Sequence, residues 1–129
     1  MDARKRVDNY ARQSRRYLKN AFKSIEAGDS DKAGEFLWGS MAEALKALAL
    51  SNGIPLRSHR QIWDYAKTIT KEIEDKSIYD AFVHANFLHS NFYECELEMS
   101  EVRRLADDIR IAVEKLLELI PKEETSAKE

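Results

Sequence analysis

The chain has 129 residues, of which 43% are hydrophobic, and its 21 Lys and Arg nearly balance its 23 Asp and Glu, for a formal net charge of −2. The length fits one domain, the hydrophobic fraction excludes global disorder, and the charge balance excludes a wholly basic nucleic-acid coat. A single cysteine, Cys95, excludes an intrachain disulfide framework and a multi-cysteine zinc site, as is typical of a reducing compartment. No apolar run approaches the roughly 20 residues of a membrane span, and the basic start lacks the apolar region of a secretory signal. We therefore expect a cytoplasmic protein.

The first predicted helix runs from about Arg4 to Ala27. Its small and apolar side chains recur at spacings that place them on one helix face: Val7, Tyr10, Ala11, Ser14, Tyr17, Leu18, Ala21 and Ile25. Gly28 follows and suits the left-handed conformation that often ends a helix. Residues 1–25 carry eight Lys or Arg against Asp2 and Asp8, whereas the rest of the chain carries 13 basic and 21 acidic side chains. Such a helix binds nucleic acid or another anionic surface, faces an acidic second chain, or packs with a solvated basic face; the sequence leaves these alternatives open.

The second predicted helix starts near Asp29–Asp31, which supply cap and first-turn carboxylates, and ends at Ser51-Asn52-Gly53. Gly34 and Gly39 lie inside it, where each costs about 1 kcal/mol relative to alanine. The simplest explanation is close approach of another helix at each position.

Three further amphipathic helices follow. The third opens at the capping box Ser58-His59-Arg60-Gln61, and the fourth is predicted to start in a similar way at Ser77-Ile78-Tyr79-Asp80. The stripe of the fourth helix comprises Ile78, Ala81, Phe82, Ala85, Leu88 and Phe92. The fifth runs to Ile120, where Pro121 ends it.

Five such helices with short connections predict an all-α fold, a single compact bundle domain over residues 1–121 followed by a disordered polar tail over residues 122–129. The apolar positions of the last helix are dense and nearly heptad-spaced. Because such a stripe is wide enough for both the core and a second chain, we expect a two-fold homodimer.

Common catalytic and metal-binding motifs are absent from the sequence. No Glu stands three residues before a histidine, and phosphate-binding glycine loops are missing. His84 and His89 project about 140° apart on a helix, so they cannot chelate one ion together. Cys95 lies between Glu94 and Glu96, whose charges disfavour the thiolate. We therefore expect no metal and no cofactor.

Polar side chains gather along the apolar stripe of the fourth helix. Asn86, His89 and Tyr93 follow one edge of the stripe, and His84 and Asn91 flank the other. These residues either hydrogen-bond to neighbouring helices at the core margin or form a shallow polar site. In the second case His89 would carry a proton or donate to phosphate near neutral pH.

Several segments resemble the archaeal PaREP-type family. Ala33-Gly34-Glu35-Phe36-Leu37-Trp38-Gly39, followed by residues 42–49, is similar to its second helix, and Gly53 with Ser58-His59 is similar to its next loop. Leu88-His89-Ser90-Asn91-Phe92-Tyr93-Glu94 resembles its L-H-x-N-F-Y-E signature. The similarity covers roughly Gly28 to Ile120. It implies a helical bundle related to HEPN domains, which usually dimerise and often work beside nucleotidyltransferases or nucleic acid, but it implies no settled activity.

Active HEPN ribonucleases use an R-x(4–6)-H motif, in which arginine stabilises phosphate charge and histidine transfers protons. No arginine stands at that spacing before His59, His84 or His89, and His84 occupies the arginine position before His89. The sequence therefore favours a protein that is not an enzyme.

The preferred hypothesis is a non-catalytic HEPN-like module that binds a partner protein, a nucleotide or RNA through a dimer groove. The candidate contacts are Arg57, His59, Arg60, Asn86, His89, Asn91 and Tyr93. Arg57, His59 and Arg60 gather at a helix N-terminus, which favours anions. One alternative is a degenerate or composite ribonuclease that uses His89 with His84. Another is binding of nucleic acid or an anionic surface by the basic first helix.

Overall fold

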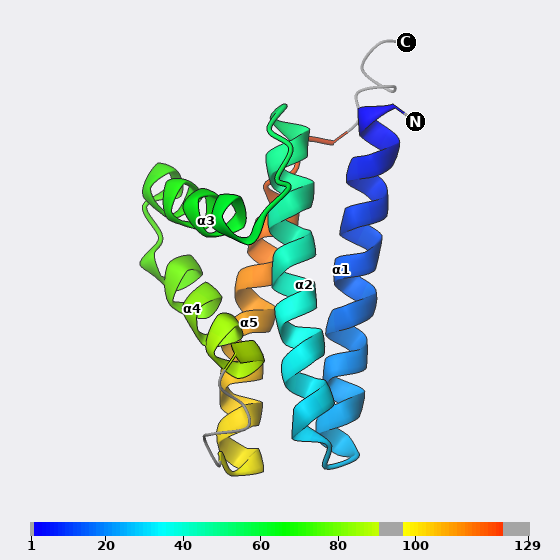
Figure 1. The fold of residues 1–129 in the computed structure, drawn as a ribbon, viewed down its shortest axis with the longest axis vertical. Coiled ribbons are helices and arrows are strands. Elements are labelled where there is room, and N and C mark those ends of the chain that lie inside the picture. Colours follow the sequence, from blue (N-terminus) through cyan, green and yellow to red (C-terminus); the bar gives the residue numbers. More distant parts are fainter. Residues whose placement is uncertain (1, 91–96, 123–129) are drawn as a thin grey trace.

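The computed structural model describes residues 2–90 and 97–122, which form five helices and contain no strand. Helices α1 (Ala3–Glu26) and α2 (Ser30–Ser51) make a long antiparallel hairpin (Figure 1). Helices α3 (His59–Ile73) and α4 (Lys76–Ser90) lie on the other side of α2 from α1, and α5 (Met99–Glu118) runs behind α2. The all-α prediction is confirmed. Within the described ranges, no helix has the length and apolar character to cross a membrane.

Most helix ends follow the predicted capping chemistry. Asp2, Asp29 and Ser58 each accept a hydrogen bond from the backbone N–H three residues later, at 2.8, 3.1 and 3.1 Å. Gly28 follows α1 with a φ of 77°, which confirms its predicted left-handed conformation. Short polar side chains thus satisfy the first free N–H groups of α1, α2 and α3.

Two details of the predicted caps are wrong. Helix α4 begins at Lys76, so Ser77 lies inside it, and the carboxylate of Asp75 accepts from both the N–H and the hydroxyl of Ser77, at 3.0 and 2.6 Å. A carboxylate one residue before the helix is a stronger acceptor than the hydroxyl we predicted. At α3, a capping box would have the side chain of Gln61 accept from the backbone N–H of Ser58. It accepts instead from the backbone N–H of Arg57, one residue earlier, at 2.6 Å.

Phe92, expected on the stripe of α4, lies outside the described residues.

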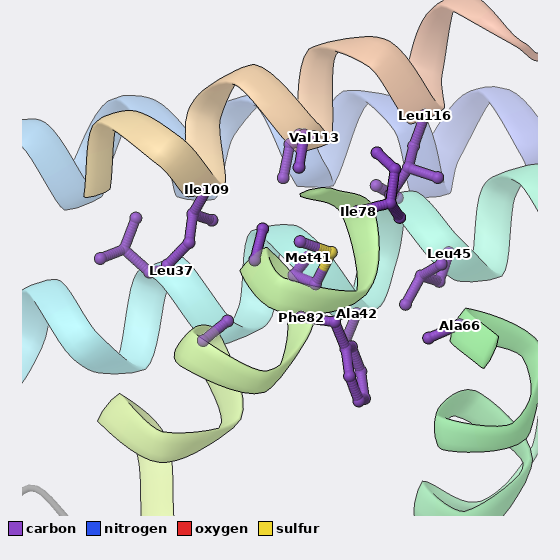
Figure 2. Close-up of a cluster of buried hydrophobic side chains, with 14 of the residues drawn as sticks. Leu37, Met41, Ala42, Leu45, Ala66, Ile78, Phe82, Ile109, Val113 and Leu116 are labelled. Carbon is purple, nitrogen blue, oxygen red and sulfur yellow. The ribbon is translucent and has the colours of Figure 1, made fainter. Parts of the chain in front are cut away.

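The hydrophobic core lies where α2, α4 and α5 meet (Figure 2). Helix α2 contributes Leu37, Met41 and Leu45, and the other helices contribute Ala66, Ile78, Phe82, Ile109, Val113 and Leu116. All of these side chains are fully buried. This core fixes the position of α4, which carries Asn86 and His89 of the predicted site.

The two interior glycines of α2 mark close approach, as predicted. A Cβ on Gly34 would lie 3.1 Å from the carbonyl oxygen of Leu88 in α4. A Cβ on Gly39 would lie 2.8 Å from Cδ2 of Tyr17 in α1. Helix α2 is therefore contacted at short range on two sides.

A buried serine pair joins α1 to α2. Ser14 donates to the carbonyl of Ser40 at 2.7 Å, and Ser40 donates to the carbonyl of Ser14 at 2.9 Å. Both residues are fully buried, which confirms that Ser14 belongs to the inner face of α1. Because each hydroxyl has a partner, the pair carries no unsatisfied donor into the core.

An ion pair between Asp75 and Lys115 links the start of α4 to α5. Hydrogen bonds from Lys115 and Ser77 lower the pKa of Asp75 from 3.8 to about 2. A carboxyl whose pKa is lowered on folding contributes stability above its unfolded pKa, and this contribution is lost as pH falls through the folded pKa. We expect Asp75→Asn to melt at a lower temperature than the native protein at pH values above about 4, and this difference to shrink towards pH about 2.

Circular dichroism melts across this pH range measure that difference. Asp80→Asn, at an exposed position of the same helix, is the control and should show no such convergence. A difference between the native protein and Asp75→Asn that stays constant with pH would contradict this assignment.

Candidate functional site

Two of the three histidines singled out in the sequence, His59 and His89, meet at one tryptophan. The ring of Trp38 in α2 lies 5.2 Å from that of His59 and 5.5 Å from that of His89, centroid to centroid. The His89 ring is stacked, with an interplanar angle of 17°. Trp63 lies 6.2 Å from His59. We call Trp38, His59, Trp63 and His89 the histidine–tryptophan surface.

Three helices and one buried ring hold this surface in place. Trp38 comes from the middle of α2, His59 and Trp63 from successive turns of α3, and His89 from the last turn of α4. Phe82 is fully buried and packs against Trp38 at 5.6 Å and against Trp63 at 5.0 Å. The edge-to-face packing of Phe82 and Trp63, at 84°, is a favoured aromatic geometry. His59 is exposed, and Trp38, Trp63 and His89 are half-buried, so the surface faces solvent.

His89 has a carboxylate beside it. Its Nδ1 atom lies 3.4 Å from Oε1 of Glu35, and the two side chains are 37% and 59% exposed. This Nδ1 makes no hydrogen bond with any described residue, so it gives no support to the interpretation that His89 hydrogen-bonds to a neighbouring helix at the core margin. When the ring is protonated, Glu35 forms an ion pair with it across α2 and α4.

The N-terminus of α3 lies beside the same surface. Arg57, His59 and Arg60 are exposed. Ser58 and Gln61 serve as caps, whereas the backbone N–H groups of His59 and Arg60 have no partner in the described part of the chain. The Arg60 guanidinium is only loosely paired, 3.5 Å from a carboxylate oxygen of Asp64 with both side chains well exposed. Free N–H groups, the helix dipole and two arginines make this end of α3 attractive to an anion.

Other predicted residues do not join this surface. His84 makes no ring contact with it, and the Nδ1 atom of His84 and the Oδ1 atom of Asn86 are buried without a hydrogen-bond partner among the described residues. Because His84 and His89 project to different sides of α4, one chain does not pair them as acid and base. Asn91 and Tyr93 lie outside the described residues. No group of three His, Cys, Asp or Glu in residues 2–90 and 97–122 is placed to hold a metal ion.

Sequence reasoning missed Trp38 and Trp63 as members of the site. Both sit at core margins, where tryptophan usually completes a hydrophobic face. One signal was available: Glu35 and Trp38 are three residues apart and share a face of α2. That face is the one that contacts His89.

Comparison with known proteins places the chain in a family. A crystal structure of a protein from Sulfolobus solfataricus superposes with a TM-score of 0.73 at 22% sequence identity, and covers 84% of this chain and 97% of that protein. At this identity the likeness shows the fold alone. A search of curated proteins gives no match. The model of the archaeal PaREP1/PaREP8 family matches residues 9–117, nearly the whole helical bundle, so the chain belongs to the archaeal PaREP1/PaREP8 family.

Proposed function

We propose that the chain is a non-catalytic HEPN-like module that binds single-stranded RNA, with one nucleotide held at the histidine–tryptophan surface. The observation that carries this proposal is the convergence of His59 and His89 on Trp38 beside the open N-terminus of α3. Half-exposed aromatic rings accept stacked bases, and each such contact is worth about 1–3 kcal/mol. The adjacent N–H groups and Arg57 would take the neighbouring phosphate.

The absence of an R-x(4–6)-H motif supports binding without cleavage. Ribonuclease action would require His84 and His89 from two subunits, because one chain directs them apart. This alternative makes a separate prediction, cleavage that depends on His89, and the experiment below tests it in the same samples.

The proposal also includes a two-fold homodimer in the cytoplasm, with a nucleotidyltransferase-like protein as a further candidate partner. Helix α5 and its C-terminal end support the dimer, because Ile111 in the helix is 55% exposed and Leu119, directly after it, is 39% exposed. Large apolar side chains exposed near one another in the chain are typical of a surface that another chain covers. Light scattering of the native protein and of Ile111→Asp tests this part.

We expect a fluorescent single-stranded RNA of ten nucleotides to bind the native protein at low salt, and His59→Ala and His89→Ala each to weaken this binding about thirtyfold, the middle of the range for one stacked base. His84→Ala is the matched control and should bind as the native protein does, because its ring lies apart from the histidine–tryptophan surface. Fluorescence anisotropy gives the affinities.

Two results would count against the proposal: no RNA binding by the native protein at low salt, or an equal loss in the His84→Ala control. Gel analysis of the same samples separates binding from chemistry. RNA that stays intact supports a binding module, whereas cleavage that His89→Ala abolishes would establish the ribonuclease alternative.

A further inference from the structure

A groove with a volume of about 1120 Å³ runs between α1 and α5, away from the histidine–tryptophan surface. It exists because α1 packs mainly on α2 and touches α5 much less. Its floor is apolar, built by Val7, Ala11, Leu18, Phe22, Leu117 and Ile120. Leu18, Phe22 and Ile120 are only half-buried, so the floor keeps apolar area open to solvent.

The wall that α1 supplies carries three cations that have no acidic partner in the part of the chain that the structure describes. Arg12, Arg15 and Lys19 follow one edge of α1 at spacings of three and four residues, and all three are exposed. No carboxylate oxygen of a described residue lies within 4.0 Å of their side-chain nitrogens. Within residues 2–90 and 97–122, Arg12 donates to the amide oxygen of Asn9, at 3.0 Å, and to no carboxylate. This row therefore presents three positive charges that no carboxylate of the described residues pairs with.

The opposite wall is different. On α5, Arg110 is paired with Glu114 at 3.4 Å, and Glu118 adds a second carboxylate. At the end of the groove Arg4 is paired with Asp8 at 3.5 Å and donates to the carbonyl of Pro121 at 2.8 Å, and Lys122 is exposed. The groove thus has a cationic wall on α1, an apolar floor and a partly acidic wall on α5.

This asymmetry selects among occupants. A nucleic acid in the groove would meet the carboxylates of Glu114 and Glu118 and a floor with one aromatic ring, Phe22. A second copy that offered its own α1 would place cations against cations. An amphipathic helix with acidic residues along one edge matches the cationic wall and the floor together.

We propose that the groove between α1 and α5 docks an acidic amphipathic helix of a partner protein. From Arg4 to Phe22 the groove follows about 27 Å of α1, the length of a helix of about 18 residues. The apolar stripe of the partner helix lies on Leu18 and Phe22. Its carboxylates recur every three or four residues and face Arg12, Arg15 and Lys19.

The test uses a synthetic helical peptide of 18 residues with leucines along one face and glutamates along one edge. A peptide of the same composition, with leucine and glutamate scattered around the helix, is the peptide control. We expect the native protein to bind the first peptide at least about tenfold more tightly than the second in fluorescence anisotropy. Equal binding of the two peptides, or binding of neither, would overturn the proposal.

Matched charge reversals on α1 locate the site. Arg12→Glu with Arg15→Glu should weaken the acidic peptide about tenfold, whereas Arg6→Glu with Arg16→Glu changes the same charge on the same helix outside the groove and should leave it unchanged. A peptide with lysine in place of glutamate should bind the first variant better than the native protein. If both double variants lost peptide affinity equally, the loss would follow from net charge and not from the groove, and the proposal would be wrong.

The same proteins distinguish the other occupants. If Arg12→Glu with Arg15→Glu turns a dimer into a monomer in light scattering, the occupant is a second copy and the proposal is wrong. If that variant loses RNA binding while the peptide never binds, the groove is the nucleic-acid surface of the first helix. Loss of RNA binding in His89→Ala alone leaves the groove untouched, so the two proposals fail independently.

Discussion

Replacement of Phe82 by alanine is expected to lower the free energy of unfolding by about 3–5 kcal/mol, the largest effect of any single substitution considered for this chain. Phe82 is fully buried, and its ring contacts Trp38, Trp63 and Tyr79 at centroid distances of 5.6, 5.0 and 6.4 Å. Alanine removes the transfer free energy of the ring and leaves a cavity between α2, α3 and α4. Because these helices carry the histidine–tryptophan surface, RNA binding should weaken together with stability.

Urea denaturation followed by circular dichroism measures the loss. Phe87→Ala is the matched control, since it removes the same side chain from the same helix at a half-buried position and should cost clearly less. Phe82→Leu keeps most of the apolar volume and should fall between the two. A loss for Phe82→Ala no larger than that for Phe87→Ala would show that Phe82 does not anchor the packing of the three helices.

The secondary structure of this chain could be predicted from its sequence because local rules determine it. Apolar spacing located the helices, and Asp29, Gly28 and Ser58 marked their ends through short-range hydrogen bonds and backbone conformation. The error at α4 arose because Asp75 and Ser77 are both good cap residues, and the carboxylate is the stronger acceptor. Asp75 also contacts Lys115, 40 residues later, and no local pattern contains that contact.

The candidate site could be predicted only in part, for a related reason. His59 and His89 were singled out from residue type and helix position, but their meeting at Trp38 depends on how α2, α3 and α4 cross. The groove between α1 and α5 was even harder to predict from the sequence. The sequence showed that the first helix is basic, but only the packing of α1 on α2 shows that Arg12, Arg15 and Lys19 border an apolar floor.

Gly34 provides the second large prediction, because it sets how closely α4 approaches α2. A Cβ there would lie 3.1 Å from the carbonyl oxygen of Leu88 and 3.5 Å from its Cβ, so a larger side chain must push the backbone of α4 away. We expect Gly34→Leu to lower the free energy of unfolding by about 1–3 kcal/mol despite the better helix propensity of leucine. Gly34→Ala should lose much less, since its gain in propensity of about 1 kcal/mol offsets the tight contact.

The same substitution should disturb the histidine–tryptophan surface, since Leu88 precedes His89 in α4. In a Trp63→Phe background Trp38 is the one remaining tryptophan of the chain, and its fluorescence reports the stacked His89 ring 5.5 Å away. We expect Gly34→Leu to change the fluorescence of Trp38 and to weaken RNA binding. The control is Lys32→Leu, at an exposed position two residues earlier in α2, which should leave both the fluorescence and the RNA binding unchanged. A Gly34→Leu protein with native stability and native Trp38 fluorescence would mean that α4 can move away from α2 without loss, and that the position of His89 does not depend on this contact.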